Sequence, residues 1–254
     1  MSIHPARPYG AGGSAEEHGR RVASMFGRIA GWYDFLNHAL SLGQDIYWRY
    51  RLVRTLRLPE TGLVLDLAAG TMDVSLEILR QHPGARVLAM DFTEPMLRRG
   101  QRKAKASARG RSTQPVLADG RRLPLPEACL DAATISFGIR NIVPRSEAFA
   151  EIHRALKPGG RMCVLEFGSG KSRVWKGLYN VYLDMILPAV GRVISGDRNA
   201  YAYLAETIRG FPPANELAEE MRAAGFAEVY WQPLLSGIVV LHVARKACEP
   251  DAGS

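Results

Sequence analysis

Polar residues follow the ends of two short apolar runs, and their types and spacing suit the recognition of a nucleoside. The first run, 63–67, leads into the small residues Ala68-Ala69-Gly70, which let a ligand approach the backbone. A helix-like stretch follows, and the start of a helix favours negative charge. The second run, 87–90, ends at Asp91, where a carboxylate can accept both hydroxyls of a ribose. The sequence therefore predicts a nucleoside pocket beyond the ends of two parallel strands.

The charges of nearby side chains narrow the class of ligand that this pocket can bind. A dinucleotide site needs Gly-x-Gly-x-x-Gly beside the pyrophosphate, whereas residues 68–72 contain only Gly70. Asp66 and Asp73 place two carboxylates where a diphosphate would be repelled. Carboxylates suit a ligand that carries an ammonium and a sulfonium, so we expect S-adenosylmethionine. Its contacts at these two strand ends are predicted to be Asp66, Gly70, Thr71 and Asp91.

Two further strand ends should contribute to the same pocket. A third apolar run around 115–117 is followed by Asp119 and Gly120, and the acid can accept a hydrogen bond from the exocyclic amine of an adenine. A fourth run, 131–137, is expected at the centre of the sheet. Because ligands bind beyond the carboxyl ends of parallel strands, its tip should face the reacting centre. The tip carries Ser136, Arg140 and Asn141.

The alternation of apolar runs with helical patterns predicts an α/β fold. Residues 229–235 and 238–244 form a final hairpin pattern, so we expect a seven-stranded, mostly parallel sheet with one antiparallel strand. Aromatic, helix-patterned residues over 19–60 are expected to cap the pocket. A second aromatic segment, 174–210, is expected to form a lid.

The rest of the chain is predicted to form a single domain over 19–247. Residues 1–18 are rich in glycine, proline and small polar residues and are expected to be a disordered tail. Residues 248–254 are expected to be a loose tail. A chain of 254 residues is long enough for one large domain with its own core.

Composition favours a cytoplasmic protein. Hydrophobic residues make up 47% and charged residues 23%, as in ordinary globular proteins. No signal peptide is visible, and no apolar run reaches the roughly 18 residues that could span a bilayer. Three isolated cysteines show neither disulfide nor metal spacing, so we expect a reducing compartment and no metal. They are Cys129, Cys163 and Cys248.

The net charge of +8 indicates an anionic partner, either nucleic acid or a membrane surface. Seven basic residues and no acid lie between Arg98 and Arg111, on an expected helix and its exit loop. This run is either a solvated helix face or a peripheral contact with an anionic membrane surface. Nucleic-acid methyltransferases usually carry Pro-Pro-Tyr, Pro-Pro-Phe or Pro-Cys after the fourth strand, and this chain has Phe137-Gly-Ile-Arg140 instead. We therefore expect no nucleic acid.

Several motifs together resemble the ubiquinone/menaquinone biosynthesis C-methyltransferase family, over roughly residues 22–246. The more specific ones are Tyr33-Asp34-x-x-Asn37 and Ser136-Phe-Gly-Ile-Arg-Asn141. Weaker ones, shared by many methyltransferases, are the glycine turn that ends at Asp73 and Leu156-Lys-Pro-Gly-Gly160. The resemblance implies a class I S-adenosylmethionine-dependent methyltransferase with a Rossmann-like fold, a helical cap and a lid.

The resemblance also implies a reaction and a set of site residues. The methyl of S-adenosylmethionine passes to a ring carbon of a prenylated quinol, with demethylmenaquinol preferred and a benzoquinol of ubiquinone biosynthesis as the alternative. Donor contacts carried over from the family are Thr71, Asp91, Asp119, Gly120 and Ser136. We expect Arg140 and Asn141 to stabilise a developing oxyanion or to position a water that takes the proton, and Tyr33 to close over the ring.

One departure from the family pattern leaves alternatives open. The family's Gly-Thr-Gly-Asp is Gly70-Thr71-Met72-Asp73 here. If the position needs a positive φ or a close approach, Met72 weakens donor binding; if it already lies in the first turn of the helix, the cost is small. A phospholipid N-methyltransferase and a donor-binding paralogue without activity remain alternatives, and the oligomeric state, including a homodimer, stays open.

Overall fold

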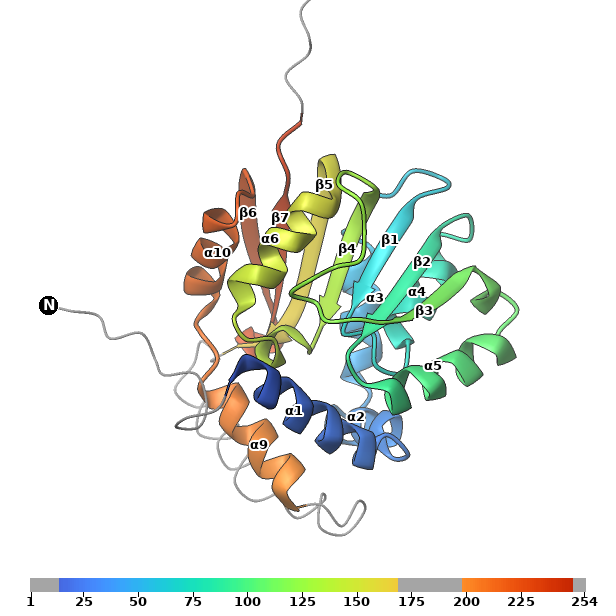
Figure 1. Ribbon diagram of the computed structural model, residues 1–254, viewed down its shortest axis with the longest axis vertical. Coiled ribbons are helices and arrows are strands. Elements are labelled where there is room, and N and C mark those ends of the chain that lie inside the picture. The colour runs from blue at the N-terminus through green and yellow to red at the C-terminus, as the bar shows by residue number, and fades with distance from the viewer. Residues whose placement is uncertain (1–13, 169–197, 249–254) are drawn as a thin grey trace, which may run out of the picture.

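A central sheet of seven strands carries helices on both faces in the computed structural model, which describes residues 14–168 and 198–248 (Figure 1). The inner strands are rich in apolar residues and largely buried, as expected for strands covered on both sides, whereas the two edge strands are more exposed. The strands are β1 (Leu63–Leu67), β2 (Arg86–Asp91), β3 (Thr113–Leu117), β4 (Leu130–Ser136), β5 (Leu156–Phe167), β6 (Glu228–Leu234) and β7 (Val239–Arg245).

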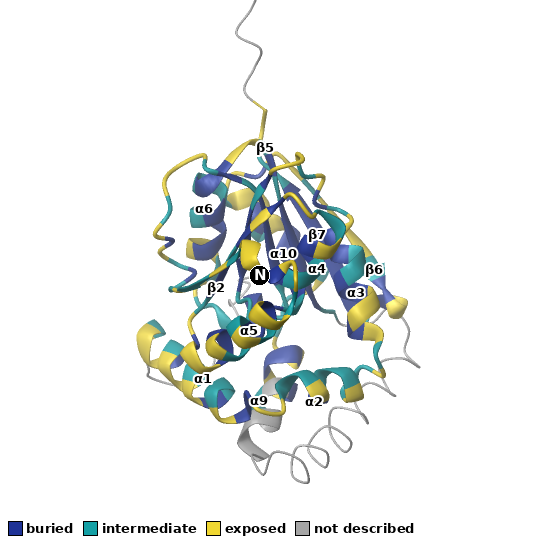
Figure 2. Ribbon diagram, turned by 90° about the vertical axis from the view of Figure 1, so that its right-hand side faces the viewer, coloured by how far each residue is buried: buried dark blue, intermediate teal, exposed yellow. Residues whose placement is uncertain are grey.

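The helices lie around this sheet, with their outer sides exposed and the strands buried between them (Figure 2). The helices along the first half of the chain are α1 (Ala15–Ile29), α2 (Tyr33–Leu40), α3 (Gln44–Val53), α4 (Asp73–Gln81) and α5 (Glu94–Ala106). Those that follow are α6 (Arg145–Ala155), α9 (Arg198–Arg209) and α10 (Ala214–Ala223). Short 3₁₀ turns are η1 (Gly110–Ser112), η2 (Ile139–Asn141) and η4 (Leu235–Gly237).

The strand order is β3-β2-β1-β4-β5-β7-β6, and only β7 runs antiparallel to its neighbours. This confirms the predicted seven-stranded, mostly parallel sheet with one antiparallel strand. The chain leaves β1 toward β2 on one side and later returns to β4 on the other. Such a reversal of strand order opens a crevice at the strand ends, where α/β proteins bind ligands.

Alternation along β1 builds a core on each face of the sheet. Leu65 and Leu67 pack with Phe149 and other residues under α6 and α10. Val64 points to the opposite face and packs with Leu52 and other residues of α3 and α4. Because successive side chains of a strand alternate between faces, Asp66 shares the face of Val64. Its side chain is therefore directed toward α3 and α4.

The first helix corrects the predicted N-terminal tail. α1 begins at Ala15, and Ser14 caps it by accepting a hydrogen bond from the backbone N–H of Glu17, whose carboxylate accepts from the N–H of Ser14 in return. This capping box fixes the helix start at Ala15, three residues before the predicted end of the tail at residue 18. Residues 1–13 lie outside the described part of the chain.

The predicted cap over 19–60 is only partly correct. α1 lies across the strand ends, with α2 beside it, and covers the crevice (Figure 1). α3 instead packs against the sheet through the buried residues Trp48, Leu52 and Val53. Of the predicted lid over 174–210, the structure describes α9, which contacts α1 and η2; residues 169–197 lie outside the described ranges. Within those ranges, no helix is long and apolar enough to cross a bilayer.

Candidate functional site

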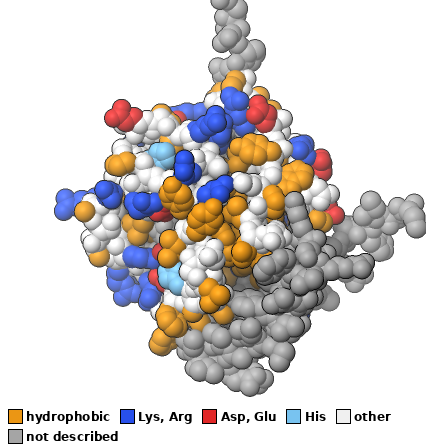
Figure 3. Space-filling model, turned by 180° about the vertical axis from the view of Figure 1, so that it is seen from behind, with side chains coloured by type: hydrophobic (Ala, Val, Ile, Leu, Met, Phe, Trp, Pro, Cys, Tyr) orange, Lys and Arg blue, Asp and Glu red, His pale blue; other side chains and the backbone are white. Residues whose placement is uncertain are grey.

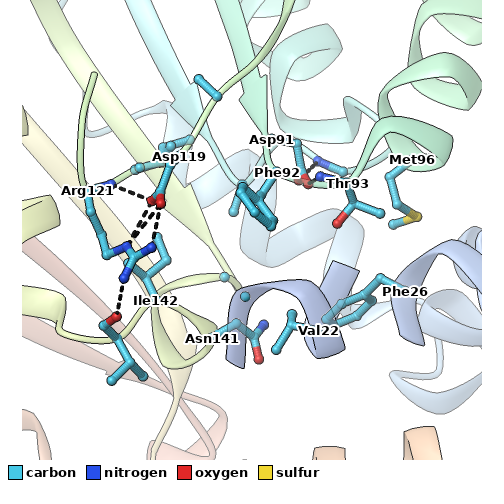
Figure 4. A pocket seen from close by; sticks show the side chains of 18 of the residues that line it. Val22, Phe26, Asp91, Phe92, Thr93, Met96, Asp119, Arg121, Asn141 and Ile142 are labelled. Atoms are coloured by element: carbon cyan, nitrogen blue, oxygen red, sulfur yellow. Dashed lines mark hydrogen bonds and ion pairs between the residues drawn. The ribbon is translucent and has the colours of Figure 1, made fainter. Parts of the chain in front are cut away.

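A pocket opens where β1, β2 and β4 end, between these strand ends and α1. Figure 4 shows Asp91 and Asp119 on the sheet side, Phe92 between them, and Val22 and Phe26 of α1 facing them. Seven of the ten predicted site residues line it: Tyr33, Gly70, Asp91, Asp119, Gly120, Ser136 and Asn141. Asp66, Thr71 and Arg140 do not belong to its lining.

Asp91 at the tip of β2 is held ready to accept hydrogen bonds. Its Oδ1 accepts from the backbone N–H of Thr93 at 2.7 Å, and its Oδ2 from the N–H of Gly70 at 2.8 Å. These bonds fix the carboxylate plane and leave each oxygen a lone pair for a further donor. Burial raises the pKa of Asp91 above its usual range, despite the two N–H groups. The arrangement fits the adjacent hydroxyls of a ribose.

Asp119 at the other end of the pocket is paired with a residue that the sequence analysis did not select. Arg121 donates to both carboxylate oxygens, at 2.6 Å to Oδ2 and 3.1 Å to Oδ1, and also to the carbonyl of Val143 (Figure 4). Hydrogen bonds from Arg121 lower the pKa of Asp119. The carboxylate therefore stays ionised and can still accept from an amine at the pocket edge.

Asp66 was predicted to contact the donor, and the structure corrects this. Its carboxylate lies on the face of the sheet that α3 and α4 cover. There Ser75 of α4 donates to it at 2.6 Å and Thr134 of β4 at 2.9 Å. The side chain is 1% exposed. Burial raises the pKa of Asp66 from 3.8 to about 6. Its hydrogen bonds join α4 to the sheet, and the side chain does not reach the pocket.

This buried acid predicts a pH-dependent stability. Because the folded pKa lies above the unfolded one, the folded state binds the proton more tightly, and the contribution of Asp66 to stability grows as the pH falls from about 7 to about 4. A shift of about two units corresponds to about 3 kcal/mol. The free energy of unfolding of the native protein, minus that of Asp66→Asn, should rise by that amount in urea titrations. A difference that stays flat over this range contradicts the assignment.

Thr71 was also expected to contact the donor, but it binds the cap instead. Its Oγ1 donates to Oδ1 of Asp34 on α2 at 2.5 Å, and the residue is buried. Lys103 of α5 pairs with the other oxygen of Asp34 at 2.9 Å and also contacts Asp73. Thr71 therefore joins the glycine turn to α2.

Met72 occupies a backbone position of the kind that favours glycine. Its φ is +65°, at the N-cap of α4. The position therefore does require a positive φ, as the first of the two alternatives for Met72 assumed. Its side chain is fully buried in a cluster with Ala89, Leu97 and Ala104 and does not line the pocket. Gly100 of α5 makes room for it, since a Cβ there would lie 2.6 Å from Cγ of Met72. Met72 therefore does not obstruct a ligand.

Met72→Gly should consequently lower stability and leave donor affinity unchanged. Glycine removes a left-handed strain of about 1–2 kcal/mol, but loss of a buried methionine side chain costs about 2–5 kcal/mol. We expect a net loss of about 1–3 kcal/mol in urea unfolding. Titration calorimetry with S-adenosylmethionine should give Kd values within about twofold of each other. A tenfold tighter Kd for the glycine variant would instead show that Met72 disturbs the pocket.

Arg140 was expected to face the reacting centre, and its position corrects this. The side chain is 4% exposed and forms an ion pair with Glu166 of β5 at 2.7 Å. Its Nη1 also donates to the carbonyl of Phe137 at 2.5 Å, and the guanidinium lies over the ring of Phe167. Phe137 has a φ of +54°, which marks a strained turn next to the pocket. Arg140 stabilises this turn through its bond to the Phe137 carbonyl.

Asn141 and Tyr33 do face the pocket. The Oδ1 of Asn141 accepts from the hydroxyl of Tyr203 on α9 at 3.1 Å, which orients the amide and leaves its Nδ2 as a donor. Tyr33 enters from the start of α2 and bonds to Asn37. Burial raises the pKa of Tyr33, so its hydroxyl remains a proton donor.

Residues of α1 line the pocket that the predicted cap was expected to cover, although the sequence analysis selected none of them as site residues. They are Ala15, His18, Gly19, Val22 and Phe26. Burial, together with the nearby Arg21, lowers the pKa of His18, so the imidazole beside the pocket is neutral at pH 7. The Ser14–Glu17 capping box was the available signal for this helix. Over residues 14–168 and 198–248, no three His, Cys, Asp or Glu side chains gather as metal ligands.

The fold resembles those of solved methyltransferases. An S-adenosylmethionine-dependent methyltransferase from Aquifex aeolicus superposes with a TM-score of 0.59 over 80% of this chain and 91% of its own, at 14% identity. The cyclase SpnF gives a TM-score of 0.67 over 91% and 96% of the two chains, at 16% identity. Together with the strand order, these similarities confirm the predicted fold.

Sequence comparison is more specific. A demethylmenaquinone methyltransferase of Mycolicibacterium vanbaalenii is 42% identical over 92% of this chain and 98% of its own. One of Thermus thermophilus is also 42% identical, over 87% and 100%. A ubiquinone/menaquinone biosynthesis C-methyltransferase of Geobacter sulfurreducens is 40% identical over 91% and 90%. The sequence model of the ubiE/COQ5 methyltransferase family matches residues 14–246, and the chain belongs to this family.

Proposed function

We propose that the protein transfers a methyl group from S-adenosylmethionine to a ring carbon of a prenylated quinol, with demethylmenaquinol as the substrate. The observation that carries this proposal is the similarity, over nearly the whole chain, to relatives named demethylmenaquinone methyltransferase. The pocket supports it, because its lining combines acids that follow β2 and β3 with apolar side chains such as Val22, Phe26 and Phe92.

The pocket lining supports an assignment of the donor contacts. Asp91 would accept from the ribose hydroxyls, and Asp119 with Gly120 would meet the adenine edge, beside the apolar side chains of Phe92 and Ile142. Gly70 and Ser136 would lie along the methionine part. When bound, the sulfonium supplies an activated methyl group with a good leaving group. The residues then have to align the methyl with the ring carbon and exclude water.

Asn141 and Tyr33 are the residues we assign to the quinol. Attack by the ring carbon requires charge on a quinol oxygen, and both side chains present hydrogen-bond donors to the pocket. Tyr203 holds the amide of Asn141 in the donating orientation. Arg140 acts indirectly, because it positions the Phe137–Asn141 turn from below; the proton acceptor is water or a group on the substrate.

The test is an anaerobic assay of the purified protein with S-adenosylmethionine and a short-tailed demethylmenaquinol. Product is identified by mass spectrometry, and the matching benzoquinol and phosphoethanolamine are assayed in parallel. Methylation of the naphthoquinol supports the proposal. If the benzoquinol or phosphoethanolamine is methylated in preference, that acceptor replaces demethylmenaquinol as the proposed substrate. Donor binding without turnover on any acceptor favours the inactive paralogue.

Asn141→Ala should lower kcat by about 10²-fold, since it removes a donor to the developing oxyanion. The KM for the methyl donor should change by less than about threefold, because the assigned donor contacts remain. Tyr203→Phe is the matched control: it keeps the amide but frees its orientation, so a smaller loss of about tenfold is expected. Equal kcat values for Asn141→Ala and the native protein contradict the role of Asn141.

We further propose that the protein works in the cytoplasm and contacts the inner face of an anionic membrane peripherally. The support is the net charge of +8 and a substrate with a prenyl tail. α5 carries much of the basic run, including Arg98, Arg102 and Lys105, which are exposed.

A further inference from the structure

Helix α2 buries Leu36 against α1 and carries a second apolar side that is exposed to solvent. Positions three or four residues apart along its outer side carry Trp32, Phe35, Ala39, Leu42 and Ile46, continuing through the turn into α3. We name this set the outer stripe. Its four large side chains are 52%, 57%, 89% and 60% exposed in chain order. A surface helix normally turns such residues to the core.

Polar side chains of α2 are tied to neighbouring elements by hydrogen bonds and ion pairs. Asp34 accepts from Thr71 and pairs with Lys103. His38 contacts Asp45 of α3 at 2.7 Å. Rolling the helix to bury the outer stripe would break these bonds and withdraw Tyr33 from the pocket. The exposure of the outer stripe is therefore built into the helix.

The segment that carries the outer stripe has an excess of positive charge. Residues 19–59 contain two acids, Asp34 and Asp45, and both are in ion pairs. Arg54, the C-cap of α3, is exposed, and Arg99 and Arg102 of α5 lie beside Asp34 of α2. Viewed from behind, hydrophobic side chains gather next to Lys and Arg on this side of the molecule (Figure 3).

We propose that the outer stripe and its arginines form the docking surface for an anionic lipid bilayer. Aromatic and aliphatic side chains on one side of a short helix, with flanking arginines, suit insertion at the level of the lipid headgroups. A second protein copy would have to bury the same arginines against themselves, which charge disfavours. The inference deepens the proposed function and rests on it for its purpose: α2 presents Tyr33 to the pocket from its inner side while its outer side meets the bilayer that holds the prenyl tail.

The experiment measures sedimentation of the full chain with vesicles, in the absence of quinol. Vesicles of phosphatidylcholine alone are compared with vesicles that also contain phosphatidylglycerol. The apolar variant is Phe35→Gln with Leu42→Gln. The matched control is Leu117→Gln with Tyr230→Gln, at positions 59% and 51% exposed on the two edge strands. A charge variant combines Arg54→Gln with Arg102→Gln.

We expect the native protein to prefer the anionic vesicles, and the apolar variant to bind them at least about tenfold more weakly. The control should bind within about twofold of the native protein, and the charge variant should lose the preference for anionic lipid. Absence of vesicle binding by the native protein, or equal binding by the apolar variant, overturns the proposal. A lower oligomeric state of the apolar variant in light scattering would assign the stripe to a second copy instead.

The proposed function is tested separately with the same variants. The apolar variant should keep its activity on a short-tailed quinol in solution, because the stripe does not line the pocket. If the native protein shows no methylation of quinols while vesicle binding follows the expected order, the proposed function fails and the docking surface stands. If methylation proceeds and vesicle binding is absent, only the docking surface fails.

Discussion

Asp91→Asn is expected to weaken the binding of S-adenosylmethionine by about 10²–10⁴-fold, because two hydrogen bonds to an ionised group contribute about 1.5–3 kcal/mol each. Asparagine retains one acceptor oxygen, and its amide nitrogen would face an N–H group of Thr93 or Gly70, both of which now donate to the carboxylate. Titration calorimetry at pH 7.5 measures the Kd directly.

The matched control for Asp91→Asn is Asp66→Asn. The two acids lie at the ends of adjacent strands, but Asp66 is bonded to Ser75 and Thr134 and does not line the pocket. Its replacement should leave the Kd within about threefold, since no donor contact is lost. If both variants lose binding equally, the acids act through the stability of the strand ends and Asp91 is not a direct ligand.

Arg140→Met is expected to lower the free energy of unfolding by about 3–5 kcal/mol, the cost of leaving a buried charge without its partner. Glu166 is 1% exposed, and Arg140 is its ion-pair partner in the structure. The same change removes the bond that holds the carbonyl of Phe137, so kcat should fall as well. Urea unfolding measures the stability, and the quinol assay measures kcat.

The double variant Arg140→Met with Glu166→Gln separates these two effects. With both charges gone, most of the lost stability should return, because the penalty comes from the unpaired charge. kcat should stay low, since the strained turn at Phe137 is still unsupported. A single variant that loses less than about 1 kcal/mol would show that the pair is dispensable.

The strand ends could be predicted from the sequence because each apolar run stops at a recognisable residue. Asp91, Asp119 and Ser136 were found in this way, and the structure brings them to one pocket. Asp66 was misplaced because the prediction used its position at a strand end and ignored its side. Because side chains alternate along a strand, Asp66 must lie on the same face of the sheet as Val64, and that face is covered by α3 and α4.

The remaining errors depend on contacts between distant parts of the chain. Arg140 is paired with Glu166, which lies on a neighbouring strand, and nothing local in the sequence reveals that pairing. The positive φ of Met72 is set by the turn, and the space for its side chain is left by Gly100 on another helix. The first turn of α1 was assigned to the tail for a different reason, because its capping box lies next to a glycine-rich segment.

The cover that α1, α2 and α9 place over the pocket has a kinetic consequence. α1 lines one wall, Tyr203 of α9 bonds to Asn141, and α2 is tied to the glycine turn through Thr71 and Asp34. We expect release of the spent donor to require some of these contacts to part. We therefore expect turnover to be limited by product release, so that a pre-steady-state burst precedes the slower steady rate.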